Sequence, residues 1–139
     1  EQKDNIITID WHTPLSFEPM LYGIVIGKNR FSLELIRKSG VFVVNFMPYS
    51  KEKEVLYCGR NSGQFKDKFK ETGLTKGECR TIDCSRIKES TAYLECEIIN
   101  EIETGDHIMF IGKVVNFKKN NDTKRLFHTH GDDFTTTLK

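Results

Sequence analysis

The stretch that decides the fold runs from Ala92 to Phe117 and reads AYLECEIINEIETGDHIMFIGKVVNF. As far as Ile102 the even positions are apolar, with the exception of Asn100, and the odd positions include several glutamates. This alternation is typical of a strand with one buried face and one solvent-facing face. The turn at 104–106 then sends the chain back, so the stretch predicts a long antiparallel hairpin. The glutamates expected on the solvent face are Glu95, Glu97, Glu101 and Glu103.

Outside this hairpin the sequence predicts short strands separated by helices. We expect strands at 5–11, 20–27 and 41–46, a loop at 12–19, helices at 29–39, after Pro48 and near 66–71, loops with a short strand at 74–90 and a loop at 118–125. Asn29 should cap the first of these helices and Gly40 should end it. Strands with inserted helices, closed by a long hairpin, predict a mainly β fold, a β-barrel with helical additions. The terminal hairpin argues against a doubly wound sheet.

The composition is that of one soluble globular domain, with 139 residues, 37% hydrophobic, 29% charged and a formal net charge of +1. The near-neutral charge argues against a dedicated nucleic-acid binder. No run of about 18 apolar residues occurs, so we expect no membrane span. The four cysteines form no CxxC pair, which favours reduced thiols in a cytoplasmic protein. Because the first residue is Glu1 and not Met, we expect a chain trimmed at its N-terminus.

The strongest local candidate for a ligand site is the turn GKNRFS at 27–32. A helix beginning there presents unpaired amides and the positive end of its dipole, which suits a phosphate. Lys28 and Arg30 add positive charge, and Ser32 adds a hydroxyl group. These features alone fit a capped surface helix with two solvated cations more often than a site, and the P-loop pattern is absent. A second candidate anion site, GRNSGQFKDK at 59–68, has an exposed polar loop as its alternative.

Other side chains give weaker indications. His107 follows the hairpin turn and could hydrogen-bond a ligand or act as an acid. Trp11, the only tryptophan, could pack against a planar ligand or belong to the core. His128 and His130 form an HxH pair without a clear third ligand, so we expect no metal site. The order of residues typical of hydrolases is absent.

Short motifs nevertheless follow one another in order over residues 5–117. They are Asn5-Ile-Ile-Thr-Ile-Asp-Trp11 with Pro14-x-Ser16-x-x-Pro19, Arg30-Phe-Ser32, Phe42-Val-Val-Asn45, Cys58-Gly-x-x-Ser-Gly63 with Asp67-Lys68-Phe69 and Gly73-Leu74-Thr75, Glu95-Cys96, and Thr104-Gly-Asp-His107 with Ile111-Gly112-Lys113-Val114. In order and spacing they resemble the flavin reductase-like family, which has the FMN-binding split β-barrel fold of Greek-key type, and within it the flavoredoxin and archaeal ferric reductase branch. Residues 1–139 would then be a single FMN-binding domain that lacks the strand usually preceding Asn5. The usual Pro-Pro is Pro19-Met20 here, and the C-terminus looks short.

The resemblance implies tightly bound, non-covalent FMN in a homodimer, close to the subunit interface. The positions that hold FMN in flavoredoxin-like members are Asn5, Trp11, Ser32, Lys68 and His107. Ser32 and the amides of Asn29, Arg30 and Phe31 would take the phosphate. Thr8, Ile9, Asp10 and Trp11 would lie along the isoalloxazine, with Lys68 and His107 on its pyrimidine side. Asn45 would face the ribityl chain, and Phe134 would lie over the flavin.

The function implied is that of a flavoprotein oxidoreductase. Hydride would pass from NADH or NADPH to FMN, and electrons from there to free flavin, ferric iron or a protein acceptor. No catalytic side chain is assigned, because positioning the nicotinamide against the flavin suffices. One alternative is an FMN-binding electron carrier without efficient NAD(P)H oxidation. A more distant one is a cofactor-free barrel that acts as a binding module, which would need aromatic residues along a basic groove.

Overall fold

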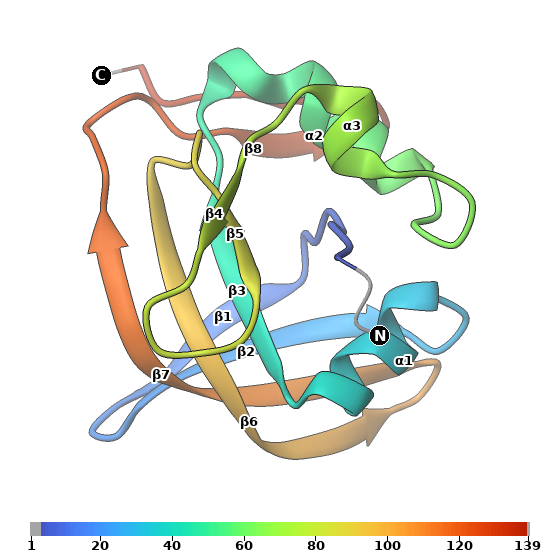
Figure 1. Ribbon diagram of the computed structural model, residues 1–139, viewed down its shortest axis with the longest axis vertical. Coiled ribbons are helices and arrows are strands. Elements are labelled where there is room, and N and C mark those ends of the chain that lie inside the picture. The colour runs from blue at the N-terminus through green and yellow to red at the C-terminus, as the bar shows by residue number, and fades with distance from the viewer. Residues whose placement is uncertain (1–3, 139) are drawn as a thin grey trace.

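A computed structural model describes residues 4–138, and strands dominate it (Figure 1). In chain order the elements are β1 (His12–Phe17), β2 (Met20–Gly27), α1 (Phe31–Ser39), β3 (Val41–Phe46), the 3₁₀ turn η1 (Tyr49–Lys51), α2 (Glu52–Arg60), α3 (Lys68–Thr72), β4 (Lys76–Glu78), β5 (Ser85–Ile87), β6 (Ala92–Thr104), β7 (His107–Lys119), β8 (Phe127–His130) and β9 (Asp133–Thr135). Within residues 4–138, no helix has the length and apolar character needed to cross a membrane.

The central element is a strongly curved five-stranded antiparallel sheet in the order β1-β2-β7-β6-β3. The expected hairpin is confirmed as β6 and β7, which pair from Ala92 with Lys119 to Thr104 with His107. Its inner face, with β2 and β3, forms the main core, around Ile26, Cys96 and Phe110. The fold is therefore the expected mainly β barrel with inserted helices, and β1 and β3 are the edge strands of the described sheet.

The first two predicted elements are exchanged in the structure. Residues 5–11, expected to form a strand, are extended but belong to no strand, and residues 12–17, expected in a loop, form β1. Pro14 is tolerated because β1 is an edge strand and its register shifts between Pro14 and Ser16. The prediction that the chain lacks the strand usually preceding Asn5 concerns a part of the chain outside the described residues.

The helix ends agree in part with the sequence. Gly40 ends α1 and Gly73 ends α3, both in the left-handed conformation that glycine favours. Asn29 was expected to cap α1, but the cap position falls on Arg30, whose side chain makes no capping hydrogen bond. The short element expected near 66–71 is confirmed as α3, which begins after Asp67 caps the amide of Lys70.

The prediction that Glu95 faces solvent is wrong. Its side chain is fully buried, and Tyr93 on the same side of β6 is buried as well. The loop between β4 and β5 folds over this face, where the amides of Arg80 and Thr81 donate to the carboxylate at 3.0 and 2.8 Å. From Glu97 onward the glutamates of β6 are exposed, as the sequence predicts.

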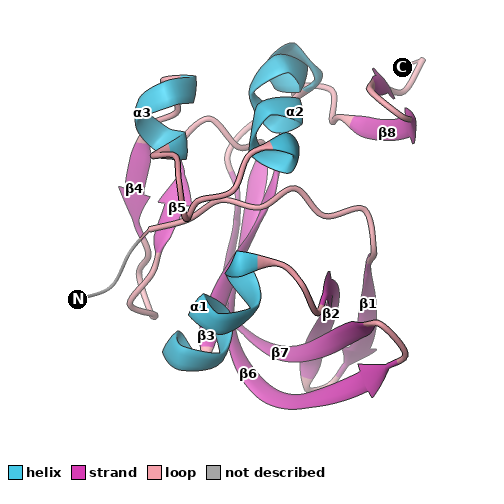
Figure 2. Cartoon of the chain, turned by 90° about the vertical axis from the view of Figure 1, so that its right-hand side faces the viewer, coloured by secondary structure: helices cyan, strands magenta, loops and turns pink. Residues whose placement is uncertain are grey.

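The molecule has two tiers (Figure 2). The curved sheet and α1 form the lower tier in that view, and α2, α3 and the hairpins β4–β5 and β8–β9 form the upper one. Residues 4–11, which we call the N-terminal segment, run as an extended chain between the two tiers before entering β1. This placement puts the segment at the centre of the candidate site.

Candidate functional site

Two cavities flank the N-terminal segment. The large cavity has a volume of about 710 Å³ and the small cavity about 440 Å³. Both volumes lie in the range of small-molecule sites, about 300–1,000 Å³. The two cavities share the following lining residues: Ile7, Thr8, Ile9, Asp10, Val55, His128 and Phe134. The N-terminal segment is thus a common wall, and its position controls both spaces.

The N-terminal segment is held by side-chain contacts that reach the upper tier. Thr8 Oγ1 donates to the carbonyl of Val55 in α2 at 2.6 Å. Gly59, one turn further along α2, permits this approach, because a Cβ there would lie only 3.2 Å from Thr8 Cβ. At its C-terminal end the carbonyl of Trp11 accepts from the amide of Val25 at 2.9 Å. These contacts hold the segment in place, although it belongs to no strand.

Lys68 holds the start of the same segment by hydrogen bonds. Its ammonium group donates to the carbonyls of Ile6 at 2.5 Å and Cys58 at 2.8 Å, and the residue is only 5% exposed. Burial lowers the pKa of Lys68. Lys68 lines neither cavity, so the structure gives it a position behind the segment, where it joins Ile6 to α2.

The small cavity is walled by pieces of six different elements and connections. They contribute Trp11 and the shared residues of the N-terminal segment, Val25, Ile26 and Gly27 at the end of β2, Arg30 before α1, Leu56, Gly59 and Arg60 of α2, His107 at the start of β7, and Gly131 and Asp132 of the C-terminal hairpin. Arg30 makes no ion pair with any described carboxylate, and it stands at the uncapped N-terminus of α1. This corner therefore combines a free guanidinium group with helix amides, which suits an anion.

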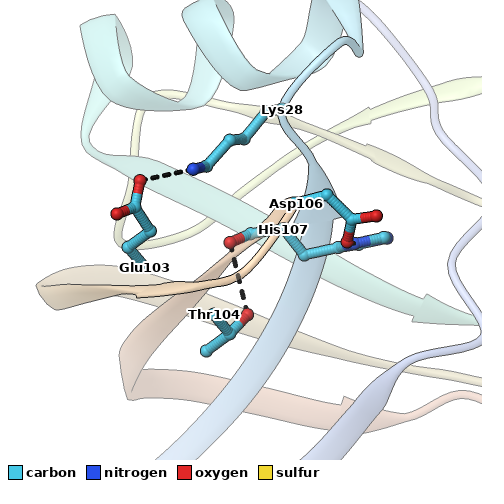
Figure 3. Close-up of polar contacts among 5 residues, drawn as sticks. All are labelled: Lys28, Glu103, Thr104, Asp106 and His107. Atoms are coloured by element: carbon cyan, nitrogen blue, oxygen red, sulfur yellow. Dashed lines mark hydrogen bonds and ion pairs between the residues drawn. The ribbon is translucent and has the colours of Figure 1, made fainter.

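An aromatic pair forms another corner of the small cavity. Trp11 stacks on His107 with ring centroids 4.3 Å apart, yet the tryptophan remains 58% exposed. His107 is fixed by Asp106, whose Oδ1 lies 2.6 Å from its Nδ1, and Thr104 Oγ1 donates to its carbonyl at 3.2 Å (Figure 3). Figure 3 also shows the ion pair of Lys28 with Glu103, which joins the residue after β2 to the end of β6.

Ser32 and Asn5 form a polar pair beside the large cavity. Asn5 Nδ2 donates to Ser32 Oγ at 2.6 Å, and Ser32 is only 6% exposed. Since Ser32 Oγ accepts this bond, its own proton is left to donate elsewhere. Asn5 Oδ1 is buried and has no hydrogen-bond partner. Such an orphan acceptor costs free energy in the absence of a donor, and it lies against Gly63, where any Cβ would collide with it.

The C-terminal hairpin closes the small cavity through two ion pairs. His128 Nδ1 lies 2.5 Å from Asp10 Oδ2, and Arg60 pairs with Asp132. His128 Nε2 lies 2.8 Å from the carbonyl of Gly131. A carbonyl and a carboxylate can only accept, so the protonated imidazole, whose two ring nitrogens both donate, satisfies both contacts. The hydrogen bond to Gly131, followed by the pair with Asp10, raises the pKa of His128.

The large cavity follows the free edge of β3 and is lined mainly by apolar core residues. Arg125 stands at its wall, with its guanidinium carbon 4.3 Å from the ring centroid of Phe46. His12 and Tyr22 lie nearby, with His12 Nδ1 2.6 Å from the tyrosine hydroxyl. Burial, and then the charge of Arg125, lower the pKa of His12. Asn45 also lines this cavity, but its Oδ1 accepts from the amide of Ile87 at 3.0 Å.

The structure therefore divides the predicted site residues into three groups. The small cavity collects Thr8, Ile9, Asp10, Trp11, Arg30 and His107. Asn5, Ser32 and Asn45 line the large cavity, and Asn29, Phe31 and Lys68 line neither. Sequence reasoning considered Arg60 for an anion site in an exposed loop and His128 for a metal, placed neither in the FMN site, and did not consider Asp132. Phe134 lines both cavities, as a residue close to the predicted site should.

Solved structures of other proteins share this fold. The crystal structure of an FMN-binding protein from Thermus thermophilus with bound 1-cyclohex-2-enone matches with a TM-score of 0.86 at 25% identity, over 95% of this chain and 78% of that one. Flavoredoxin of Desulfovibrio vulgaris (Miyazaki F) matches with a TM-score of 0.89 at 20% identity, over 97% and 79% of the two chains.

The chain belongs to the flavin reductase-like family, because the family model described as "Flavin reductase like domain" matches residues 1–137. An uncharacterised protein of Archaeoglobus fulgidus is 38% identical over 133 residues, which are 96% of this chain and 69% of that relative. The chain spans 63% of a second curated relative. The resemblance found in the sequence motifs is thereby confirmed.

Proposed function

We propose that the small cavity binds FMN, with its phosphate at Arg30 and the first turn of α1 and its ring system beside Trp11 and His107. The observation that carries this proposal is the convergence in one cleft of an unpaired guanidinium group, an uncapped helix N-terminus and a stacked aromatic pair. The similar Thermus thermophilus protein is described as FMN-binding, which supports the same ligand class.

The residues present fit such a ligand. Arg30 supplies a cation for the phosphate, and Trp11, which is 58% exposed, supplies an open ring face for the flavin. Gly27 leaves the corner between Asn29 and His107 open, since a Cβ there would lie 3.3 Å from Asn29 Oδ1 and 3.7 Å from His107 Nε2. A larger residue at 27 would fill space beside the aromatic pair.

The proposed activity is oxidation of NADH or NADPH with transfer of electrons to free flavin, ferric iron or a protein acceptor. Bound FMN would supply the hydride-accepting centre. The chain's own residues bind and orient: Arg30 neutralises the phosphate, Trp11 and His107 fix the plane of the ring, and the C-terminal hairpin excludes water. His107 and the protonated His128 are both held by aspartates, and we assign neither an acid–base step.

The second candidate is an FMN-binding electron carrier that oxidises nicotinamides slowly. The volume of the small cavity favours it, because about 440 Å³ lies near the low end of ligand sites and leaves little enclosed space for a second ligand. The exposed face of Trp11 would then lie on the route to a protein partner.

An absorption spectrum of the purified protein, followed by anaerobic addition of NADH and NADPH, tests both candidates. Oxidised-flavin bands that bleach rapidly are the expected result, and the faster nucleotide identifies the donor. Bands that stay after nicotinamide but bleach with dithionite favour the electron carrier. A protein that takes up no FMN, whether purified or reconstituted, contradicts the proposal.

Three further properties are proposals of the same kind. A homodimer with FMN near its interface is expected from the family, and light scattering of the flavin-loaded protein tests it. Residues 1–139 would form one domain, and a cytoplasmic location, expected from the cysteine pattern, stays a prediction.

A further inference from the structure

Two of the four cysteines meet at the tip of the β4–β5 hairpin. The last described ladder pair of this hairpin is Glu78 with Ser85, so the next positions outward on the two strands are Cys79 and Cys84. The amide of Cys79 donates to the carbonyl of Cys84 at 3.3 Å, which extends the pairing by one step. Hydrogen-bonded antiparallel pairs have Cα atoms about 5.5 Å apart. This separation falls within the span of about 4.4–6.8 Å that a disulfide bridges.

The other two cysteines provide a contrast. Cys58 in α2 is 2% exposed and Cys96 in β6 is fully buried. Cys79 and Cys84 are only partly buried, and each has the other as its neighbouring thiol. All four are free thiols in the structure. Only Cys79 and Cys84 therefore combine mutual proximity with access to a reagent from solution.

The tip of the β4–β5 hairpin makes hydrogen bonds whose geometry a cross-link between the two cysteines would affect. Arg80 and Thr81, between the two cysteines, hold the buried carboxylate of Glu95. On the adjoining strands, Lys76 and Ser85 bind the carboxylate of Asp4 at 2.7 and 3.0 Å. The tip thus joins β6 to the start of the N-terminal segment, and Cys84 itself lines the large cavity.

We propose that Cys79 and Cys84 are a redox-responsive dithiol that closes to an intramolecular disulfide by exchange with a small-molecule disulfide. One thiolate attacks the small disulfide, forms a mixed disulfide and releases one thiol. The second thiolate then attacks the mixed disulfide, forms the Cys79–Cys84 bond and releases the second thiol. The two cysteines are oxidised, the small disulfide is reduced to two thiols, and the protons lost by the cysteines are taken up by those products. The closed form fixes the tip that carries Arg80 and Thr81.

The acidity of the two thiols sets the rate and direction of this exchange. Burial raises the pKa of Cys79 to about 12 and that of Cys84 to about 11. Closure is therefore slow at neutral pH and accelerates about tenfold per pH unit, as the thiolate fraction grows. Poorly acidic thiols are also poor leaving groups, so the closed disulfide resists reduction.

Peptide mapping tests the proposal directly, because trypsin cleaves after Lys76, Arg80 and Arg86 and separates the two cysteines. The protein is incubated with oxidised glutathione at pH 8.5 until its mass is constant, alkylated and digested. We expect peptides 77–80 and 81–86 joined by a disulfide, with Cys58 and Cys96 alkylated after unfolding. Glutathione adducts without closure, bonds to Cys58, Cys96 or a second chain, or four alkylated cysteines would each overturn the proposal.

Matched variants separate closure from general oxidation. Cys79→Ser and Cys84→Ser should each abolish the joined peptide, whereas Cys58→Ala should leave it unchanged. Closure should raise the melting temperature by about 5 °C, since the cross-link restricts the unfolded chain. Cys84→Ser treated in the same way should show no such rise. An equal rise in the variant and the wild type would mean that the tip disulfide is not its cause.

Discussion

The β6–β7 hairpin and the N-terminal segment are held in place by different kinds of hydrogen bond. The hairpin pairs with itself over its whole length, and its partners are neighbours across one turn. The N-terminal segment is just as rich in β-branched residues but belongs to no strand. It is held by Lys68 and by the contact of Thr8 with Val55, far along the chain. A regular pattern therefore produces a regular element only where a partner strand is available.

Glu95 is the residue of the hairpin whose replacement should reduce stability most, because it is buried where the alternating pattern predicts an exposed side chain. Burial alone would raise the pKa of Glu95, but hydrogen bonds from Thr81, Arg80 and Asn116 outweigh it and lower the pKa from 4.5 to about 2. Glu95→Gln should reduce the free energy of unfolding by about 3 kcal/mol at pH 7. Because the folded pKa is lowered, the wild-type advantage is complete above about pH 4.5 and is lost as the pH falls towards 2. Urea unfolding of both proteins at several pH values measures this.

The control for that experiment lies two residues further along β6. Glu97 is exposed and shares the same sequence pattern, so Glu97→Gln should change stability by less than about 0.5 kcal/mol. If both variants lost the same free energy of unfolding, the burial of Glu95 would not be the source of its larger contribution to stability.

The N-terminal segment should depend most on Lys68. Lys68→Met removes the donor of two carbonyl groups, and we expect a loss of about 2 kcal/mol in stability together with weaker FMN binding. Equilibrium unfolding and flavin titration provide the two measurements. Lys70→Met, at an exposed position of the same helix, is the matched control. Unchanged FMN affinity in Lys68→Met would show that the position of the segment does not govern the cleft.

Arg30 tests the anion corner of the small cavity. Arg30→Gln should weaken FMN binding about tenfold and reduce its salt dependence, since one cation near the phosphate is lost. Titration of flavin fluorescence at two salt concentrations measures both effects. Arg37→Gln serves as the control, because Arg37 lies near the other end of α1 and pairs with Glu101. Similar losses in the two variants would indicate a general charge effect and no local phosphate site.

The smallest effect is expected at the C-terminal hairpin. The folded pKa of His128 is raised, so its contribution is complete below about pH 6.5 and disappears as the pH rises through the folded value. The pair with Asp10 is partly exposed, which limits its worth to less than about 1 kcal/mol. Amide exchange of residues 127–135 should therefore accelerate with pH beyond the intrinsic trend. In His128→Gln this additional acceleration should vanish, and in His130→Gln it should remain.

Much of the fold was predictable from local patterns. The hairpin β6–β7, the strands β2 and β3 and the helix ends at Gly40 and Gly73 follow from periodicity and glycine placement. The exchange of strand and loop at 5–17 was not predictable, because Pro14 is acceptable only on an edge strand, and edge position is a property of the assembled sheet.

Half of the residues predicted for the site line one cavity, and their role in binding stays a prediction. Trp11, Arg30 and His107, chosen from motifs far apart in the sequence, do line one cleft. Arg60 and His128 were not predicted to lie at the cleft, because only the folded hairpin β8–β9 brings Asp132 to Arg60 and His128 to Asp10.

By itself the sequence determined the barrel, its long hairpin and the family, since these depend on repeating patterns and on motifs read in order. Only the tertiary structure decided that Glu95 is buried and that Lys68 supports the N-terminal segment without lining either cavity. The reason is the distance along the chain. Thr81 lies 14 residues from Glu95, and Ile6 lies 62 residues from Lys68. A hydrogen bond over such a span leaves no periodic trace, because it exists only once the barrel has brought its two ends together.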